Sequence, residues 1–175
     1  MAIGVPLGLA GGQTGVSSTS FTLTTTADAP AGAAILVVFA FNVIISGLTV
    51  VDSAANTYTV LPLQAAASRR FGLAYCADPV DLPSGGTITL SWTTAAAVSA
   101  AAASVSGLAT TSPLDVTGTA TSGTATSATP VASGTLAQAA EILIGVDYFQ
   151  NSPGTFSPGG SFAQIAGPSL GTGTD

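Results

Sequence analysis

The chain contains no histidine, no lysine and a single cysteine, and its only two basic side chains are the adjacent Arg69 and Arg70. Histidine is the side chain used most often for general acid–base catalysis, and lysine, cysteine and histidine supply many nucleophiles and metal ligands. Phosphate and nucleic-acid binding depend on clusters of lysine and arginine. The composition therefore predicts a protein that is not an enzyme and that holds no cofactor and no metal ion.

Charge is scarce throughout the chain. Charged residues make up 6% of the 175 residues, against roughly 25% in ordinary soluble domains. Threonine, serine, alanine and glycine must therefore cover the surface, and such a surface loses little hydration energy on contact, which suits extensive protein–protein contact. The net charge of −6 disfavours nucleic acids and anionic membranes as partners.

Signals for export or membrane insertion are also missing from the chain. One cysteine excludes an internal disulfide, and the opening MAIGVPLGLAGG has no basic region of the kind that begins a secretory signal. The longest apolar run, residues 33–41, is far shorter than the roughly 20 residues needed to cross a bilayer. We expect a soluble protein made in the cytoplasm, the alternative being that a signal has been removed.

What is present is a β pattern: short runs rich in β-branched and aromatic residues, separated by Gly, Pro, Asn, Asp and Ser. A chain of this length fits one domain, which we place at 19–166, between a flexible arm at 1–18 and a flexible tail at 167–175. The predicted strands are 19–26, 33–41, 48–51, 57–61, 70–77, 87–93, 95–105, 141–149 and 161–165.

Eight or nine strands at this spacing predict an all-β fold, an antiparallel β-sandwich that is jelly-roll-like. The run 33–41 is apolar on both faces, as expected of a central strand covered on both sides. The alanine-rich run 95–105 favours a helix by propensity, but its valines and its β neighbours favour a strand. Residues 117–127 are a long loop or a flat edge strand. The likeness of 33–39 to 140–146 indicates either a duplication or two similar central strands.

Two carboxylate pairs deserve comparison with known site chemistry. Asp78 and Asp81 lie three positions apart in a proline-containing loop, where they are solvated turn caps or, alternatively, part of a Ca²⁺ site. Glu141 and Asp147 are six residues apart in one predicted strand, a separation of about 20 Å that is too long for the paired carboxylates of a glycosidase. Neither pair indicates catalysis.

The remaining candidates are single side chains with a structural and a functional interpretation. Arg69 and Arg70 open a predicted strand and point to opposite faces. Either one is solvated and the other pairs with a loop aspartate, or the two form a contact between subunits, where arginine is enriched. Cys76 lies on the small-residue face of the same strand and is predicted to be a buried, inert thiol. Trp92 shares a face with Ile88, so it belongs to the core or, alternatively, is a sugar-stacking platform.

Residues 47–59 read GLTVVDSAANTYT, which predicts two short strands joined as a hairpin by the loop 52–56. Asp52 and Asn56, at the ends of this loop, suit side-chain-to-backbone turn bonds. The segment resembles the V-x-D-S-x-G-N-x-Y module of β-sandwich domains in bacterial secreted proteins and phage structural proteins. The flanking strands extend the likeness over roughly residues 31–148, and Ala55 departs from the glycine that the module favours. The resemblance implies a non-enzymatic display, adhesion or shell module.

Our leading hypothesis is a phage capsid decoration or cement protein, located on the virion after synthesis in the host cytoplasm. Its partners would be the major capsid protein and further copies of itself, with a trimer favoured. The alternative is a secreted or cell-surface adhesion module that binds carbohydrate, which a groove exposing Tyr58, Tyr75 or Trp92 would favour. A domain of a phage fibre or spike is the third hypothesis.

Overall fold

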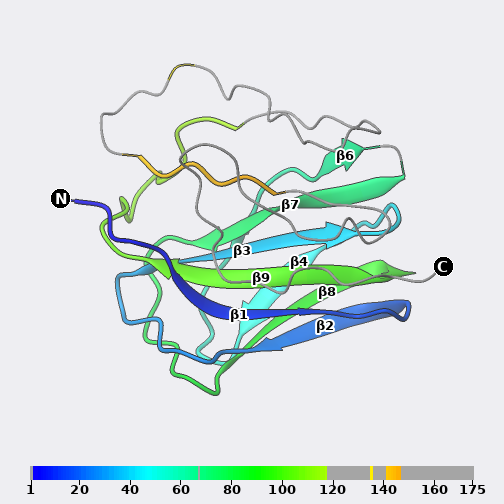
Figure 1. The fold of residues 1–175 in the computed structure, drawn as a ribbon, viewed down its shortest axis with the longest axis horizontal. Helices are drawn as coiled ribbons and strands as arrows, with labels where there is room; N and C mark the ends of the chain where they lie inside the picture. Colours follow the sequence, from blue (N-terminus) through cyan, green and yellow to red (C-terminus); the bar gives the residue numbers. More distant parts are fainter. Residues whose placement is uncertain (1, 67, 118–134, 136–140, 147–175) are drawn as a thin grey trace, which may run out of the picture.

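The computed structural model describes residues 2–66, 68–117, 135 and 141–146. Two antiparallel sheets form a sandwich (Figure 1), one with the strand order β1-β9-β3-β7-β5 and with β6 also paired to β7, the other with the order β2-β8-β4. The predicted all-β antiparallel sandwich of eight or nine strands is confirmed. The strands are β1 (Leu7–Gln13), β2 (Ser18–Thr24), β3 (Ala34–Phe41), β4 (Thr49–Asp52), β5 (Thr59–Val60), β6 (Gln64–Ala66), β7 (Arg69–Cys76), β8 (Thr87–Ala96) and β9 (Val98–Val105).

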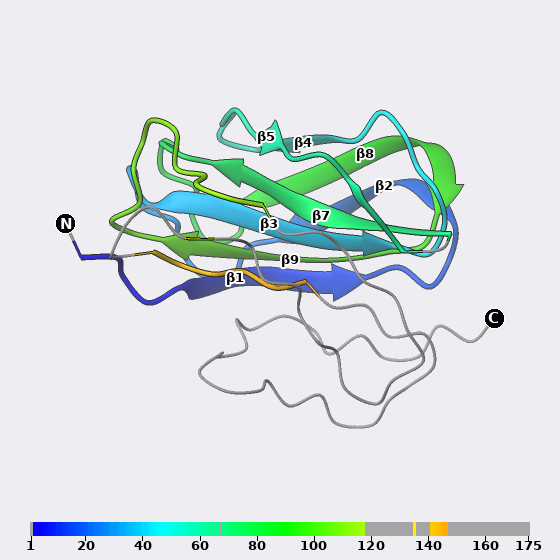
Figure 2. The same cartoon turned by 90° about the horizontal axis from the view of Figure 1, so that it is seen from above.

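The chain crosses repeatedly between the two sheets. β1, β3, β7 and β9 belong to the six-stranded sheet, while β2, β4 and β8 belong to the three-stranded sheet, which lies over it in Figure 2. The described residues contain no helix, and hence none that is long and apolar enough to span a membrane.

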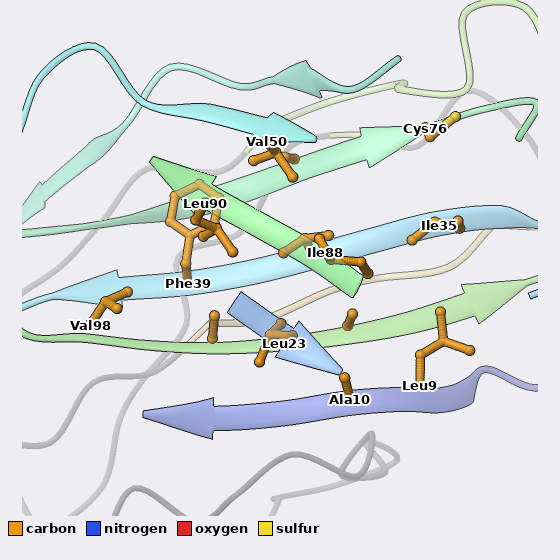
Figure 3. Close-up of a cluster of buried hydrophobic side chains, with 14 of the residues drawn as sticks. Leu9, Ala10, Leu23, Ile35, Phe39, Val50, Cys76, Ile88, Leu90 and Val98 are labelled. Atoms are coloured by element: carbon orange, nitrogen blue, oxygen red, sulfur yellow. The ribbon is translucent and has the colours of Figure 1, made fainter. Parts of the chain in front are cut away.

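The core lies between the facing sides of the two sheets (Figure 3), and β3 and β8 each contribute four buried residues to it. Ile35, Val37 and Phe39 of this strand point into the core and are at most 1% exposed. On the opposite face of β3, Leu36 and Ala40 are also buried. The predicted central strand, covered on both sides, is therefore confirmed.

The alternation predicted for 87–93 and the strand predicted for 95–105 are both present. Ile88, Leu90 and Trp92 of β8 are buried in the core. The alanine-rich segment forms the end of β8 and then β9, which is hydrogen-bonded to β1 on one side and to β3 on the other. Pairing along both edges satisfies the backbone of β9, and this tertiary pairing outweighs the helix propensity of alanine.

The predicted flexible arm at 1–18 contains a strand instead. Leu7–Gln13 forms β1 at the edge of the six-stranded sheet, and its Leu9 side chain is fully buried. Glycine in this strand serves close packing rather than mobility, because a Cβ on Gly12 would lie 3.0 Å from the ring of Phe21. The glycine-rich sequence predicts an arm, whereas in the structure Gly12 lets β1 approach β2 closely.

The predicted hairpin of 48–51 and 57–61 is not formed. β4 pairs with β8 and β5 pairs with β7, so the two strands belong to different sheets and the turn between them crosses the sandwich. The same turn residues are compatible with a hairpin and with a crossing between sheets. The distant strands β8 and β7 decide which pairing forms.

The C-terminal predictions are tested only in part. Residues 141–146 are described and form no strand. Ile144 from this segment lines a small hollow together with Leu36 and Val38 of β3. The proposed likeness of two central strands is therefore wrong for 141–146. The predictions for 118–127, 147–149, 161–165 and 167–175 lie outside the described residues.

Candidate functional site

The outer face of the three-stranded sheet carries hydroxyl groups in a regular array. Because Leu23, Val50, Ile88 and Leu90 point into the core, the alternate residues of the same strands point outward. The strand register places Ser91 between Ser20 and Thr49, and Thr89 between Thr22 and Val51. We call this array the hydroxyl face, and its members are Ser20, Thr22, Thr24, Thr49, Val51, Thr87, Thr89 and Ser91.

The hydroxyl face contains no charged side chain, although the chain has a net charge of −6. Its members on the two edge strands are exposed and those on β8 are partly exposed. The hydroxyls of Thr22 and Thr89 lie 3.0 Å apart and share a hydrogen bond across the strands. A partner that covers this face has no ion to desolvate, and hydroxyls find new hydrogen bonds readily.

A second feature is the turn that connects β4 of one sheet to β5 of the other. Asp52 Oδ1 accepts hydrogen bonds from the backbone N–H groups of Ala54 and Asn56, each at 3.0 Å. Asp52 Oδ2 accepts from Asn56 Nδ2 and from the Tyr58 hydroxyl, each at 2.9 Å. The predicted turn bonds of Asp52 are thereby confirmed, and one carboxylate organises the whole crossing.

Asn56 extends this network to the loop that follows β7. Its Oδ1 accepts from the Val80 N–H at 2.7 Å, and its Nδ2 donates to the Val80 carbonyl at 3.2 Å. On the other side of the turn, Ser53 Oγ accepts from the Thr87 N–H at 3.1 Å. The Asp, Ser, Asn and Tyr of the sequence motif therefore have structural roles, and they fix the turn to both sheets.

Ala55 lies at the top of this turn with φ of +60°. A left-handed backbone is costly for an L residue with a Cβ and is adopted readily by glycine. The position at which this sequence departs from the resembled module is therefore the position that requires a positive φ. The network of Asp52 holds Ala55 in this conformation.

An open depression of about 420 Å³ lies between this turn and the loop after β7. Its base is the end of β7, and Asn56 joins its two sides through the hydrogen bonds to Val80. The residues that line it are Ala54, Ala55, Asn56, Thr57, Thr59, Tyr75, Cys76, Ala77, Asp78 and Val80. Tyr75 thus borders this concave surface, whereas Tyr58 donates its hydroxyl to Asp52.

Two ionisable groups beside this depression, Tyr58 and Cys76, have raised pKa values. Burial raises the pKa of Tyr58, and the hydrogen bond and charge of Asp52 raise it further. Burial also raises the pKa of the Cys76 thiol, more than its backbone hydrogen bonds near Asp78 and Thr57 lower it. Cys76 is a free cysteine that is 4% exposed, so the predicted burial of this thiol is confirmed.

No family model, no curated protein and no solved structure matches this chain. The function of the chain must therefore be argued from its own residues.

The structure places the two arginines at the start of β7, both half-buried. Arg69 donates to the carbonyl of Asn42 and Arg70 donates to the carbonyl of Arg69, each at 2.8 Å. They lie on a different sheet from the hydroxyl face and do not border the depression. A role for this pair between subunits stays a prediction.

Trp92 belongs to the core. It is 5% exposed, and its ring meets the ring of Phe41 edge-on with centroids 4.9 Å apart. Its indole Nε1 is buried and has no hydrogen-bond partner among the described residues. The alternative interpretation of Trp92 as a sugar-stacking platform is wrong, because no sugar reaches this ring.

The acidic residues of the described chain do not converge. Asp78 and Asp81 are both exposed, and the described residues contain no group of three or more Asp, Glu, Cys or His side chains placed to hold a metal ion. The described surface has two features suited to binding a partner, the hydroxyl face and the depression beside the β4–β5 turn. The depression was not predicted from the sequence, because its two sides, at Asn56 and Val80, are 24 residues apart. The sequence signal for it was the asparagine four residues after Asp52.

Proposed function

We propose that this protein is a non-enzymatic structural component of a phage particle, a capsid decoration protein that binds the shell built by the major capsid protein. The observation that carries the proposal is the hydroxyl face, a sheet surface without a single charged group on an acidic chain. Decoration requires a rigid domain that covers neighbouring subunits, and no chemistry. The resemblance to phage structural domains supports the same assignment.

Forming an interface through the hydroxyl face costs less free energy than forming one through charged side chains. Specific interfaces bury about 800 Å² on each partner, and charged residues are depleted at their centres because ions are costly to desolvate. An acidic protein that approached a partner through its carboxylates would also meet electrostatic repulsion from further copies of itself. The hydroxyl face avoids both costs, and its backbone is held rigid by the pairing of β8 with β2 and β4.

Two finer assignments belong to this proposal. The strand orders β1-β9-β3-β7 and β2-β8-β4 support a jelly roll, an architecture shared by many capsid domains. We also propose a closed homo-oligomer, with a trimer favoured, since most soluble oligomers have closed symmetry. Arg69 and Arg70 are the proposed contact between its copies, because they are the only basic residues in an acidic sequence.

The test is the composition of purified particles from cells that produce the protein. Mass spectrometry should find it in a copy number of the same order as the major capsid protein. A handful of copies would indicate a tail or fibre protein, and absence from particles with recovery from the medium or the cell surface would contradict the proposal in favour of an adhesion module.

A variant pair connects this test to the hydroxyl face. Thr89→Asp places a charge at the centre of the face, whereas Thr110→Asp places the same charge in the exposed loop after β9. The first should abolish incorporation into particles and the second should leave it unchanged, with circular dichroism showing that both variants are folded. Equal incorporation of both would exclude this face as the contact with the shell.

A further inference from the structure

We propose that the depression between the β4–β5 turn and the loop after β7 binds one ring of a neutral saccharide. This inference goes beyond the proposed function and does not depend on it. It rests on three properties of the depression: its walls are fixed before a ligand arrives, its lining combines an aromatic ring with hydroxyls and a carboxylate, and the lining excludes other ligand classes.

The first property is preorganisation. The Asn56 side chain bridges from one wall to the other through two hydrogen bonds to Val80, at 2.7 and 3.2 Å. Asp52 in turn holds Asn56 through both its backbone and its side chain. The distance between the walls is therefore set by the fold, and a ligand does not lose affinity by having to order them.

The second property is the lining itself. Ligand sites are commonly concave and mostly apolar, with a small number of polar groups that orient the ligand. Here the apolar part comes from three alanines and Val80, and the aromatic part from Tyr75. The polar part comes from the exposed side chains of Thr57, Thr59 and Asp78.

Tyr75 is the central element of this lining. Its strand register sets it opposite Thr59 of β5, so an aromatic ring and a hydroxyl are neighbours at the edge of the depression. Its hydroxyl has no hydrogen-bond partner among the described residues. A tyrosine side chain combines an apolar face, which suits the C–H side of a sugar ring, with a hydroxyl at its tip.

The third property is what the lining excludes. An anion would find no cationic side chain there and would be repelled by Asp78. A metal ion would find one exposed carboxylate, because Asp52 already accepts four hydrogen bonds. A hydrocarbon would strip water from Asp78 and from two threonine hydroxyls without replacing their hydrogen bonds. A neutral polyhydroxylated ring satisfies all of these groups.

The volume is consistent with this ligand class. A depression of about 420 Å³ lies at the lower end of the range of about 300–1,000 Å³ found for small-molecule sites. Because it is open, one ring would be held while neighbouring rings remained in solvent. The expected affinity is therefore in the millimolar range for a single ring, and several copies on one particle would add avidity.

The experiment is a titration of the full ¹⁵N-labelled chain with neutral sugars, namely glucose, galactose, N-acetylglucosamine and maltose, followed by amide chemical shifts. We expect at least one of them to give saturable shifts confined to residues 54–59 and 75–80. Glucose 6-phosphate, which carries the same ring with an anion, should bind more weakly than glucose. If none of the four sugars gives saturable shifts at millimolar concentrations, the proposal is wrong.

Variants separate binding at this depression from unspecific effects. Tyr75→Ala should weaken binding about three- to tenfold through loss of the aromatic contact, and Tyr75→Phe should retain most of the affinity. Because truncating Tyr75 also alters β7, Thr57→Trp offers a second variant, which fills the depression from an exposed turn position and should abolish the shifts. Thr110→Ala, in the loop after β9, is the matched control.

Each result decides between alternatives. Sugar binding that survives Thr57→Trp would place the ligand elsewhere and overturn the proposal. Sugar binding that Thr57→Trp abolishes supports it, whether or not the protein is found in phage particles, because incorporation and sugar binding are measured in separate assays. Failure of the shell proposal thus leaves this inference standing, and the reverse also holds.

Discussion

Asn56 and Val80, 24 residues apart in sequence, are joined by a pair of hydrogen bonds from one side-chain amide to both the N–H and the carbonyl of a single peptide residue. Asp52 holds the same amide from the other side at 2.9 Å. The chain passes from one sheet to the other through this arrangement, so the stability of the turn and the shape of the depression depend on the same few atoms.

The Asp52 carboxylate should be the most important polar group of this turn. Asp52→Ala removes the acceptor of four hydrogen bonds and leaves the partly buried Tyr58 hydroxyl without a partner, so we expect a loss of about 2–4 kcal/mol in the free energy of unfolding. Urea denaturation followed by circular dichroism measures it. Asp81→Ala, an exposed aspartate, should change this free energy by no more than about 0.5 kcal/mol; equal effects of the two variants would show that the network is not stabilising.

Ala55→Gly should stabilise the protein by about 0.5–1 kcal/mol. The φ of +60° is strained for alanine by roughly 1–2 kcal/mol, and part of that gain is offset by the greater entropy of glycine in the unfolded chain. The midpoint of urea denaturation should rise. Ala54→Gly provides the matched control, since Ala54 does not have a positive φ and should lose stability instead. A loss of stability in Ala55→Gly would contradict the assignment of strain to this residue.

Stability should fall in alkali through Tyr58. Burial and Asp52 raise its pKa above the ordinary value of about 10, so the unfolded chain releases this proton at lower pH than the folded one. The contribution is complete below about pH 10 and is lost as pH rises through the folded pKa, with a slope of at most about 1.4 kcal/mol per pH unit because one proton is involved. Denaturation midpoints from pH 8 to 11 measure this slope.

Two variants show how much of the loss of stability in alkali comes from Tyr58 and how much from Cys76. Tyr58→Phe cannot ionise and should lower stability at neutral pH while flattening the slope above about pH 10. Cys76, whose pKa burial also raises, contributes a loss that begins near the ordinary thiol value of about 8.5, and Cys76→Ala should remove that earlier part. An unchanged slope in Tyr58→Phe would refute the role given to this hydroxyl.

The N-terminal strand should be part of the cooperative fold. Leu9→Ala removes a fully buried side chain, and a loss of about 2–5 kcal/mol is typical for such a truncation. Leu7→Ala, two residues earlier in the same strand and 49% exposed, should cost less than about 1 kcal/mol because little buried area is lost. Comparable small effects of both variants in thermal unfolding would restore the view of 1–18 as a free arm.

The parts of the fold that could be predicted from the sequence are those with a strong local pattern. β3 is apolar on both faces and β8 alternates large apolar residues with threonines, so their burial followed from side-chain period alone. β1 was missed because its glycines carry no pattern, and the role of Gly12 depends on Phe21 of another strand. The pairing of β4 and β5 was missed because the partners β8 and β7 are distant in sequence.

The candidate site was predictable only where its contacts are local. Asp52 bonds the backbone two and four residues further on, and this turn chemistry follows from the spacing in the sequence. The bridge from Asn56 to Val80 is a long-range contact, and so is the placing of Tyr75 beside Thr59. The hydroxyl face required the register of three strands, although the alternation within each strand was already visible.

The pairing of β1 with β9 has a consequence for synthesis. Leu7 faces Ser104 in the ladder, so β1 leaves the ribosome more than 80 residues before its partner β9. Until then, the backbone N–H and C=O groups along this edge of β1 have no partner strand. Contacts of such long sequence separation form slowly. During translation the pairing of β1 with β9 therefore forms in a late step, and a nascent chain arrested before residue 98 leaves β1 open to proteases and to strands of other molecules.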